Sequence, residues 1–221
     1  MTDHIEDDDE AAYAAYMAAT CEREQDALTD QEKLAMDAMN VMCQAAEEKA
    51  EAAMIIARTM DPAVEGLREL SWAYVEYGEM TVDPDALVIS PSTVNDKTVE
   101  QVAILLLHEW GHIKFDHLTR WRALRAFRAE LNDPGNHPVW HIAWNIAADL
   151  EINAALLKQY GAAMLEDDGV FPGFGLYADI PADLKAEEYF QLIRATPALW
   201  ASVERRAGQK LKSKADAPFS P

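Results

Sequence analysis

A polar cluster interrupts an apolar run at residues 104–117, ILLLHEWGHIKFDH. On a helix, His108 and His112 lie about 40° apart after one full turn, so their imidazoles share one face. That spacing suits two nitrogen ligands of a tetrahedral zinc ion. Glu109 follows His108 directly and could take the proton of a water molecule that the metal activates. The pattern predicts a zinc site with its general base; the alternative is a helix with two hydrogen-bonded histidines and no metal.

A catalytic zinc needs a third protein ligand, and His117 is the nearest candidate. On a continuous helix, however, His117 would lie about 140° round from His112. It could bind the same ion only if the helix broke after His112, and residues 113–116 contain neither glycine nor proline. We therefore expect His117 to be a structural or supporting histidine, and keep a ligand role as the alternative.

The better candidate for the third ligand is Asp149. Asn145, Asp149 and Asn153 recur every four residues and form a polar stripe between apolar neighbours. A carboxylate in such a stripe is hard to explain as core, whereas a metal ligand held by amide groups one turn away on each side explains it. We predict that Asp149 completes the site; an ordinary solvated helix face is the alternative.

Other polar residues near these positions receive weaker assignments. Glu151 lies about 200° round the helix from Asp149, so we expect it to point elsewhere. His141, two turns before Asp149, could line the site without binding metal. Tyr160 and Tyr177 are candidates for stabilising an oxyanion, by the chemistry of their side chains alone.

The elements that must position these residues are mostly helical. Thr29 with Glu32, and Thr98 with Gln101, match the capping box that begins a helix. Together with apolar periodicity, these signals predict helices over residues 34–60, 63–77, 98–117, 118–131, 138–160 and 183–194.

Strand signals are brief and lie before the histidine helix. Residues 80–82 and 87–89 flank the turn sequence DPDA, so they could form a hairpin. We predict an α+β fold, with a small sheet packed beside the 98–117 helix. If the strand at 87–89 is at the edge of that sheet, it could pair with an extended substrate backbone.

Composition and charge limit the possible partners and the compartment. The chain has 221 residues and a formal net charge of −20. This acidity disfavours nonspecific nucleic-acid binding and contact with an anionic membrane, so we expect neither. Two cysteines are too few for a disulfide scaffold, and the acidic N-terminus does not resemble a signal peptide. No apolar run reaches the roughly 20 residues of a membrane span, and we expect a cytoplasmic protein.

The order of three groups of residues along the chain resembles that in a zinc metallopeptidase domain family of bacteria and phages. Domains of that family are often fused to a von Willebrand factor A-like domain. The three groups are residues 108–112 with His117, residues 144–153 around Asp149, and the AEEYF segment at 186–190. The resemblance covers residues 62–195 and implies a zincin-like core with a catalytic zinc. Since only residues 196–221 follow, we expect no von Willebrand factor A-like domain here.

We divide the chain accordingly into an acidic arm with a long helical extension at 1–60, the catalytic domain at 61–195 and a loose basic tail at 196–221. A chain starting near Asp61 should then still bind zinc. The predicted activity is that of a zinc endopeptidase acting on a peptide or protein. The alternatives are a zinc amidase or deformylase with a small substrate, and a catalytically silent, metal-stabilised protein that binds a partner through its acidic N-terminal helix.

Overall fold

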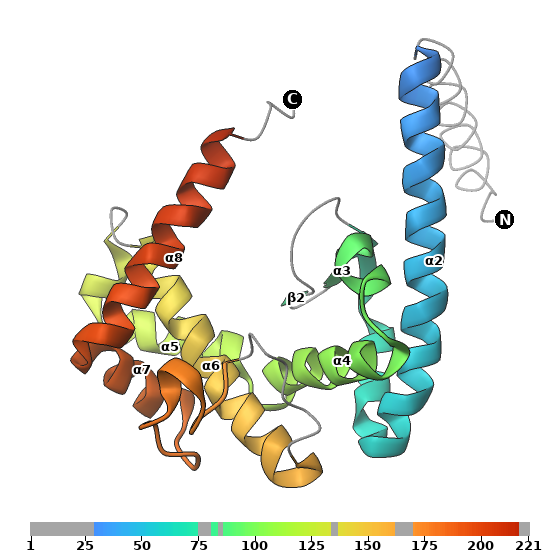
Figure 1. The fold of residues 1–221 in the computed structure, drawn as a ribbon. Helices are drawn as coiled ribbons and strands as arrows, with labels where there is room; N and C mark the ends of the chain where they lie inside the picture. The colour runs from blue at the N-terminus through green and yellow to red at the C-terminus, as the bar shows by residue number, and fades with distance from the viewer. Residues whose placement is uncertain (1–28, 75–80, 84–85, 134–136, 162–169, 217–221) are drawn as a thin grey trace, which may run out of the picture.

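The fold is that of a computed structural model, which describes residues 29–74, 81–83, 86–133, 137–161 and 170–216. The predicted acidic arm at residues 1–12 lies outside these ranges. The described chain is mostly helical, as the sequence predicts (Figure 1). Its helices are α2 (Asp30–Met60), α3 (Pro91–Asn95), α4 (Val99–Lys114), α5 (His117–Phe127), α6 (His137–Tyr160), α7 (Ala186–Ala195) and α8 (Pro197–Asp216), with short 3-10 helices η1 (Pro62–Glu69), η2 (Ala129–Asn132) and η4 (Gly175–Tyr177).

Both predicted capping boxes are present. In each, the side chain of the N-cap threonine accepts a hydrogen bond from the backbone N–H of the third residue of the helix. The side chain of that third residue accepts one from the backbone N–H of the threonine. Thr29 and Glu32 begin α2 in this way, and Thr98 and Gln101 begin α4. The start of the histidine helix is therefore fixed by local sequence, which sets the rotation of His108 and His112.

A small sheet of three strands lies beside α4, with β2 against that helix. The strands are β1 (Ser71–Tyr74), β2 (Thr81–Asp83) and β3 (Ala86–Ile89), in the order β1-β3-β2. β2 pairs antiparallel with β3, as the hairpin prediction requires, while β1 pairs with β3 in parallel. Since β3 is central, it cannot act as the edge strand proposed for substrate pairing.

The helix predicted over residues 63–77 is wrong for residues 63–74, and residues 75–77 lie outside the described ranges. The chain instead forms η1 and then turns at Leu70, which has an extended backbone, into strand β1. The parallel partner of β1 is residues 86–89, so a pairing that is distant in sequence overrides the local helical periodicity.

Two apolar cores lie on either side of the α4–α6 contact. One joins α2, η1, β3, α3 and α4, and includes Met54, Leu87 and Leu106. The other joins α5, α6, α7 and α8 around Trp144, Tyr189 and Phe190. Figure 1 shows α4 running from α2 on one side toward α6 on the other. Any site between α4 and α6 is thus positioned by the packing of both cores.

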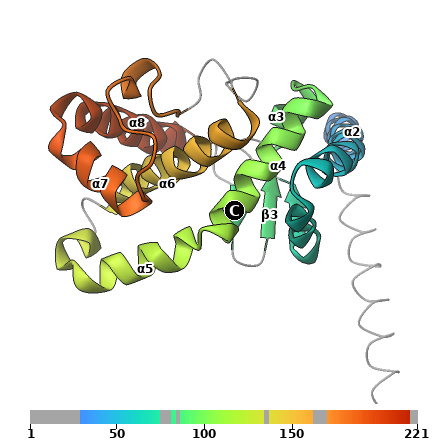
Figure 2. The same cartoon turned by 90° about the horizontal axis from the view of Figure 1, so that it is seen from below.

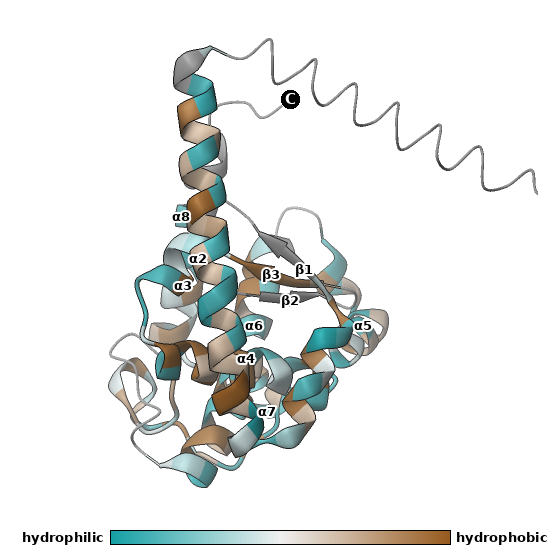
Figure 3. Ribbon diagram, turned by 90° about the vertical axis from the view of Figure 1, so that its right-hand side faces the viewer, coloured by the Kyte–Doolittle hydropathy of each residue, from teal (hydrophilic) through white to brown (hydrophobic). Residues whose placement is uncertain are grey.

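The second half of α2 belongs to the first core. Its buried face carries Met54 and a row of fully buried alanines, namely Ala46, Ala50, Ala53 and Ala57. Lys49 donates hydrogen bonds to the carbonyl oxygens of Asn95 and Lys97, which ties α2 to the end of α3. The first half of α2 projects beyond the rest of the described chain (Figure 3). A domain boundary at residue 60 therefore cuts through packed structure.

The C-terminal segment differs from the predicted loose tail. Residues 197–216 form α8, which buries Leu199, Val203 and Ala207 in the second core. The preceding helix, α7, begins at Ala186 with Lys185 at the N-cap, a few residues later than the predicted start at Asp183. Within the described ranges, we find no helix that has the length and apolar character needed to cross a membrane.

The histidine helix breaks where the sequence analysis expects it to continue. α4 ends at Lys114, and Asp116 adopts a left-handed conformation with φ 54°. Aspartate is one of the few residues other than glycine that enters this region readily, so a break is possible without glycine or proline. α5 begins at His117 and leaves α4 in a new direction (Figure 2).

Candidate metal centre

His108, His112 and Asp149 come together where α4 meets α6. Nε2 of His108 and Nε2 of His112 each lie 3.4 Å from Oδ1 of Asp149. One ligand atom from each of the three residues can be chosen so that all lie within 4.8 Å of one another. All three side chains are partly exposed, so the cluster can be reached from solvent.

The spacing of these atoms fits a tetrahedral metal ion. Zinc binds histidine nitrogen and carboxylate oxygen at about 2.0–2.2 Å, so two ligand atoms at a tetrahedral angle lie about 3.4 Å apart. Both nitrogen–oxygen distances have this value. Two imidazoles and one carboxylate are also a donor set that catalytic zinc uses, with a fourth position left open.

The close approach of α4 to α6 depends on Gly111. A Cβ atom added at Gly111 would lie 2.8 Å from Cγ2 and 2.9 Å from Cγ1 of Ile152. Such contacts are far below van der Waals distance, so any side chain at position 111 would force Ile152 or the helices themselves to move. The glycine between the two histidines therefore allows Asp149 to reach both of them.

The electrostatics of the cluster are those of a cation site. Burial alone would lower the pKa of His108, but the hydrogen bond and charge of Asp149 raise it to about 9. Burial would raise the pKa of Asp149, yet the two histidines hold it well below its usual range. Asp149 is thus ionised, and the histidine beside it carries a proton that a metal ion would replace.

Asn153 orients His108 rather than Asp149. Its Oδ1 lies 2.9 Å from Nδ1 of His108, and its amide nitrogen donates to the carbonyl oxygen of Val170. Because that second bond fixes the amide, Oδ1 accepts a proton from Nδ1, so Nε2 of His108 is the nitrogen that a metal ion would bind in place of the proton shared with Asp149. The predicted role of Asn153 as a support for the carboxylate is therefore corrected to a support for a histidine.

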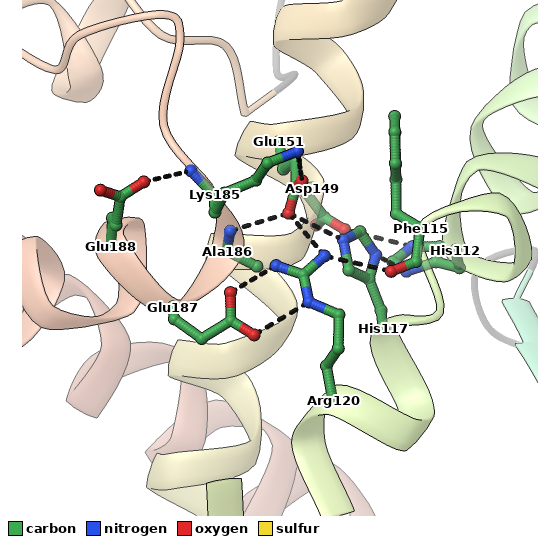
Figure 4. A network of polar contacts seen from close by, with 10 residues as sticks. All are labelled: His112, Phe115, His117, Arg120, Asp149, Glu151, Lys185, Ala186, Glu187 and Glu188. Atoms are coloured by element: carbon green, nitrogen blue, oxygen red, sulfur yellow. Dashed lines mark hydrogen bonds and ion pairs between the residues drawn. The ribbon is translucent and has the colours of Figure 1, made fainter. Parts of the chain in front are cut away.

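His112 is oriented through His117, which the helix break brings back beside it. The two Nδ1 atoms lie 3.2 Å apart, and Nε2 of His117 lies 3.2 Å from Oε2 of Glu151 (Figure 4). His117 is 2% exposed and does not belong to the three-residue cluster. It thus contacts the candidate ligand His112 through Nδ1 and lies outside the cluster itself.

Glu151 is the centre of a buried charge network (Figure 4). Besides His117, its carboxylate accepts from the backbone N–H of Ala186 at 2.7 Å and pairs with Arg120 at 2.9 Å and Lys185 at 3.2 Å. Burial would raise the pKa of Glu151, but these partners together lower it to about 2. As predicted, Glu151 has other partners than Asp149. It contacts His117, the residue that lies against His112.

Glu109, the predicted general base, is 5% exposed and follows His108 on α4. Its charge is felt at His108, where it adds to the effect of Asp149 on the pKa of that imidazole. A buried carboxylate beside the histidines is chemically suited to exchange protons with a bound water molecule.

The remaining predicted residues lie at different places. His141 is exposed and contacts the Trp121 ring edge-on. The Tyr160 hydroxyl donates to the Met60 carbonyl oxygen at the end of α2. Tyr177 is buried, and burial raises the pKa of its hydroxyl, with the charge of Asp149 adding to this rise. Of the two tyrosines, Tyr177 is therefore the one whose hydroxyl pKa is affected by the charge of Asp149.

Sequence reasoning missed the network around Glu151. Arg120 and the N-terminus of α7 join the site only through tertiary packing, so their spacing in the sequence carries no signal. The position of Glu151 itself carries a signal. It lies between Leu150 and Ile152, both buried, and a charged residue in such surroundings needs partners.

Comparison with known proteins agrees with this chemistry. The model of a family described as "Putative metallopeptidase domain" matches residues 46–218, which include all three residues of the cluster, Glu109 and the Glu151 network. No curated protein and no solved structure matches the chain. The matched segment also includes the second half of α2, which packs into the first core, and all of α8, which packs into the second. The chain belongs to this metallopeptidase domain family.

Proposed function

We propose that this protein is a zinc-dependent metallopeptidase in which His108, His112 and Asp149 bind the metal and Glu109 is the general base. The observation that carries the proposal is the equal 3.4 Å distance from each Nε2 to Oδ1 of Asp149, which is the edge of a zinc tetrahedron. A histidine-bearing helix beside a small sheet also supports a zincin-like core.

The roles of the chain's own residues follow from this arrangement. When bound, zinc would supply a Lewis acid that activates water and polarises the substrate carbonyl. Glu109 accepts a proton from the attacking water and delivers it to the leaving amide nitrogen, so that the cleaved bond ends as carboxylate and amine. Asn153 and His117 hold the imidazoles in the tautomer that binds metal.

The test compares three full-length proteins: the parent, Glu109→Gln and Glu100→Gln. Glu100 is an exposed carboxylate in the first turn of the same helix, so it controls for the loss of one charge on α4. Each is loaded with zinc and incubated with a peptide library whose products are read by mass spectrometry. A formylated or acetylated small-substrate panel is run in parallel.

We expect all three proteins to hold one zinc per chain. Glu109→Gln should lose hydrolysis by roughly a hundredfold or more, as removal of a general base does, while Glu100→Gln should match the parent. Cleavage of the small-substrate panel but of no peptide would make the enzyme an amidase. Full peptide cleavage by Glu109→Gln would overturn the mechanism.

A further inference from the structure

A line of side chains leads from the buried carboxylate of Glu151 to the cluster formed by His108, His112 and Asp149. Glu151 on α6 contacts Nε2 of His117 on α5, and Nδ1 of His117 contacts Nδ1 of His112 on α4. Nε2 of His112 in turn faces Asp149 at 3.4 Å. Three different helices thus contribute to one chain of contacts that ends at the candidate metal position.

The direction of each hydrogen bond follows from the carboxylate. The carboxylate of Glu151 accepts from the Ala186 N–H and pairs with Arg120 and Lys185, so it acts as an acceptor toward His117 as well, and the proton between them belongs to Nε2 of His117. A neutral imidazole that donates from Nε2 must accept at Nδ1. The proton between the two Nδ1 atoms therefore belongs to His112, and Nε2 of His112 keeps the lone pair that a metal needs.

The opposite arrangement is disfavoured by its surroundings. If His117 carried two protons, Nδ1 of His112 would have to accept, and Nε2 of His112 would carry a proton toward Asp149. That state would place a buried imidazolium close to the guanidinium of Arg120, which already pairs with Glu151.

We propose that Glu151 is a positioning residue of the metal centre, which sets the tautomer and orientation of His112 through His117. The proposal rests on the proposed function in one respect, namely that His112 is a metal ligand. Because Glu151 also accepts from the Ala186 N–H, the same residue links the metal site to the first turn of α7. Carboxylates that support a ligating histidine directly are common in metal sites, and here the support passes through a second imidazole.

Glu187 offers a matched control in the same network. Its carboxylate pairs with Arg120, as does that of Glu151, but the contacts of His117 are to Glu151 and His112 (Figure 4). Glu187→Gln therefore makes the same chemical change next to the same arginine. Glu187, however, is not one of the residues whose contacts lead from Glu151 to His112. A purely structural role of the network would make both substitutions act alike on metal binding.

The experiment measures zinc affinity of the full-length protein by competition with a chromophoric chelator, and folding by circular dichroism without metal. Glu151→Gln should weaken zinc binding by about 10–100-fold. Glu187→Gln should change it by less than about threefold, as expected for a partly exposed ion pair. Equal zinc affinity in folded Glu151→Gln and parent protein would overturn the proposal, as would equal losses in both variants.

A second pair of variants decides the matter if Glu151→Gln does not fold. His117→Gln keeps one donor and one acceptor in place of the imidazole, whereas His117→Leu keeps neither. His117→Gln should therefore retain at least about tenfold more zinc affinity than His117→Leu. If the two bind zinc equally well, the chain of hydrogen bonds does not position His112.

These measurements separate the proposal from the proposed activity. Zinc affinity is read without substrate, so a protein that depends on Glu151 for zinc but cleaves no peptide retains the positioning role and loses the peptidase assignment. A peptidase whose zinc affinity is unaffected by Glu151 and His117 gives the reverse result. A parent protein that binds no zinc overturns both.

Discussion

Gly111 of α4 lies directly against the side chain of Ile152 in α6. A Cβ atom at position 111 would come within 2.8 Å of Cγ2 and 3.2 Å of Cδ1 of that isoleucine. Gly111 directly precedes His112 on α4, and Ile152 lies three residues after Asp149 on α6, so the contact helps to set the distance between the two helices at the candidate metal site.

The first prediction concerns this contact. Gly111→Ala should lower the free energy of unfolding by about 1–3 kcal/mol, because the extra methyl group overpacks the helix interface. It should also weaken zinc binding, since the helices must separate. The double variant Gly111→Ala with Ile152→Ala makes room and should regain zinc affinity relative to Gly111→Ala alone. Chemical denaturation and chelator competition measure both effects; an undiminished zinc affinity in Gly111→Ala would contradict them.

The second prediction is the ligand set. His108→Ala, His112→Ala and Asp149→Ala should each lose stoichiometric zinc, as judged by elemental analysis after dialysis. His117→Leu should still reach one zinc per chain at saturating metal, because His117 supports a ligand without being one. His141→Ala, an exposed histidine on the same helix as Asp149, is the control and should match the parent. A site emptied by His117→Leu but kept in Asp149→Ala would reverse the assignment.

The sequence predicts those parts of the fold and site that depend on local geometry. Capping boxes at Thr29 and Thr98 begin their helices as expected, because the bonds lie within four residues. The one-turn spacing of His108 and His112 and the four-residue stripe containing Asp149 follow from helix periodicity in the same way. The structure brings these three residues together.

What the sequence does not predict depends on contacts between distant segments. Strand β1 forms because residues 86–89 lie beside it, against the local helical pattern. The break at Asp116 depends on an aspartate in the left-handed region, a conformation that a glycine at this position would have indicated but an aspartate does not. Glu151 finds its partners on α5 and α7, so its role is visible only once the helices are packed.

The third prediction tests the domain boundary. A chain beginning at Asp61 loses the buried face of α2, including Met54, and the bonds from Lys49 to the end of α3. Loss of a buried methionine alone costs about 2–5 kcal/mol, a large part of the usual stability of a domain. We now expect this shortened chain not to fold, whereas one beginning at Gln44, just before the family match, should fold and bind zinc. Circular dichroism and zinc analysis of both chains decide the boundary.

The fourth prediction is a dependence on pH. The hydrogen bond from Arg120 holds the pKa of Glu187 below its ordinary value of 4.5. A carboxyl with a lowered pKa in the folded state stabilises the fold above its unfolded pKa, and this contribution is lost as the pH falls through the folded pKa. Glu187→Gln should therefore be less stable than the parent at pH 7, by under about 1 kcal/mol.

That difference should shrink when the unfolding of both proteins is measured near pH 3, below the ordinary carboxyl pKa of 4.5, where the unfolded chain binds the proton and the contribution of the pair is reduced. Glu47→Gln, which changes an exposed carboxylate on α2, serves as the control. The same difference at both pH values would show that the Arg120–Glu187 pair does not carry the effect.

The left-handed residue Asp116 has a consequence for how this family can vary. Between His112 and His117 the chain ends one helix and begins another, so the number of residues in this junction sets the direction in which His117 faces. Inserting or deleting one residue there would change the direction in which His117 faces relative to His112, while leaving the candidate ligands unchanged. Asparagine or glycine can replace Asp116, since both adopt the same conformation. Homologous proteins that keep the contacts from Glu151 through His117 to His112 can therefore differ in the identity of residue 116 but not in the length of the junction.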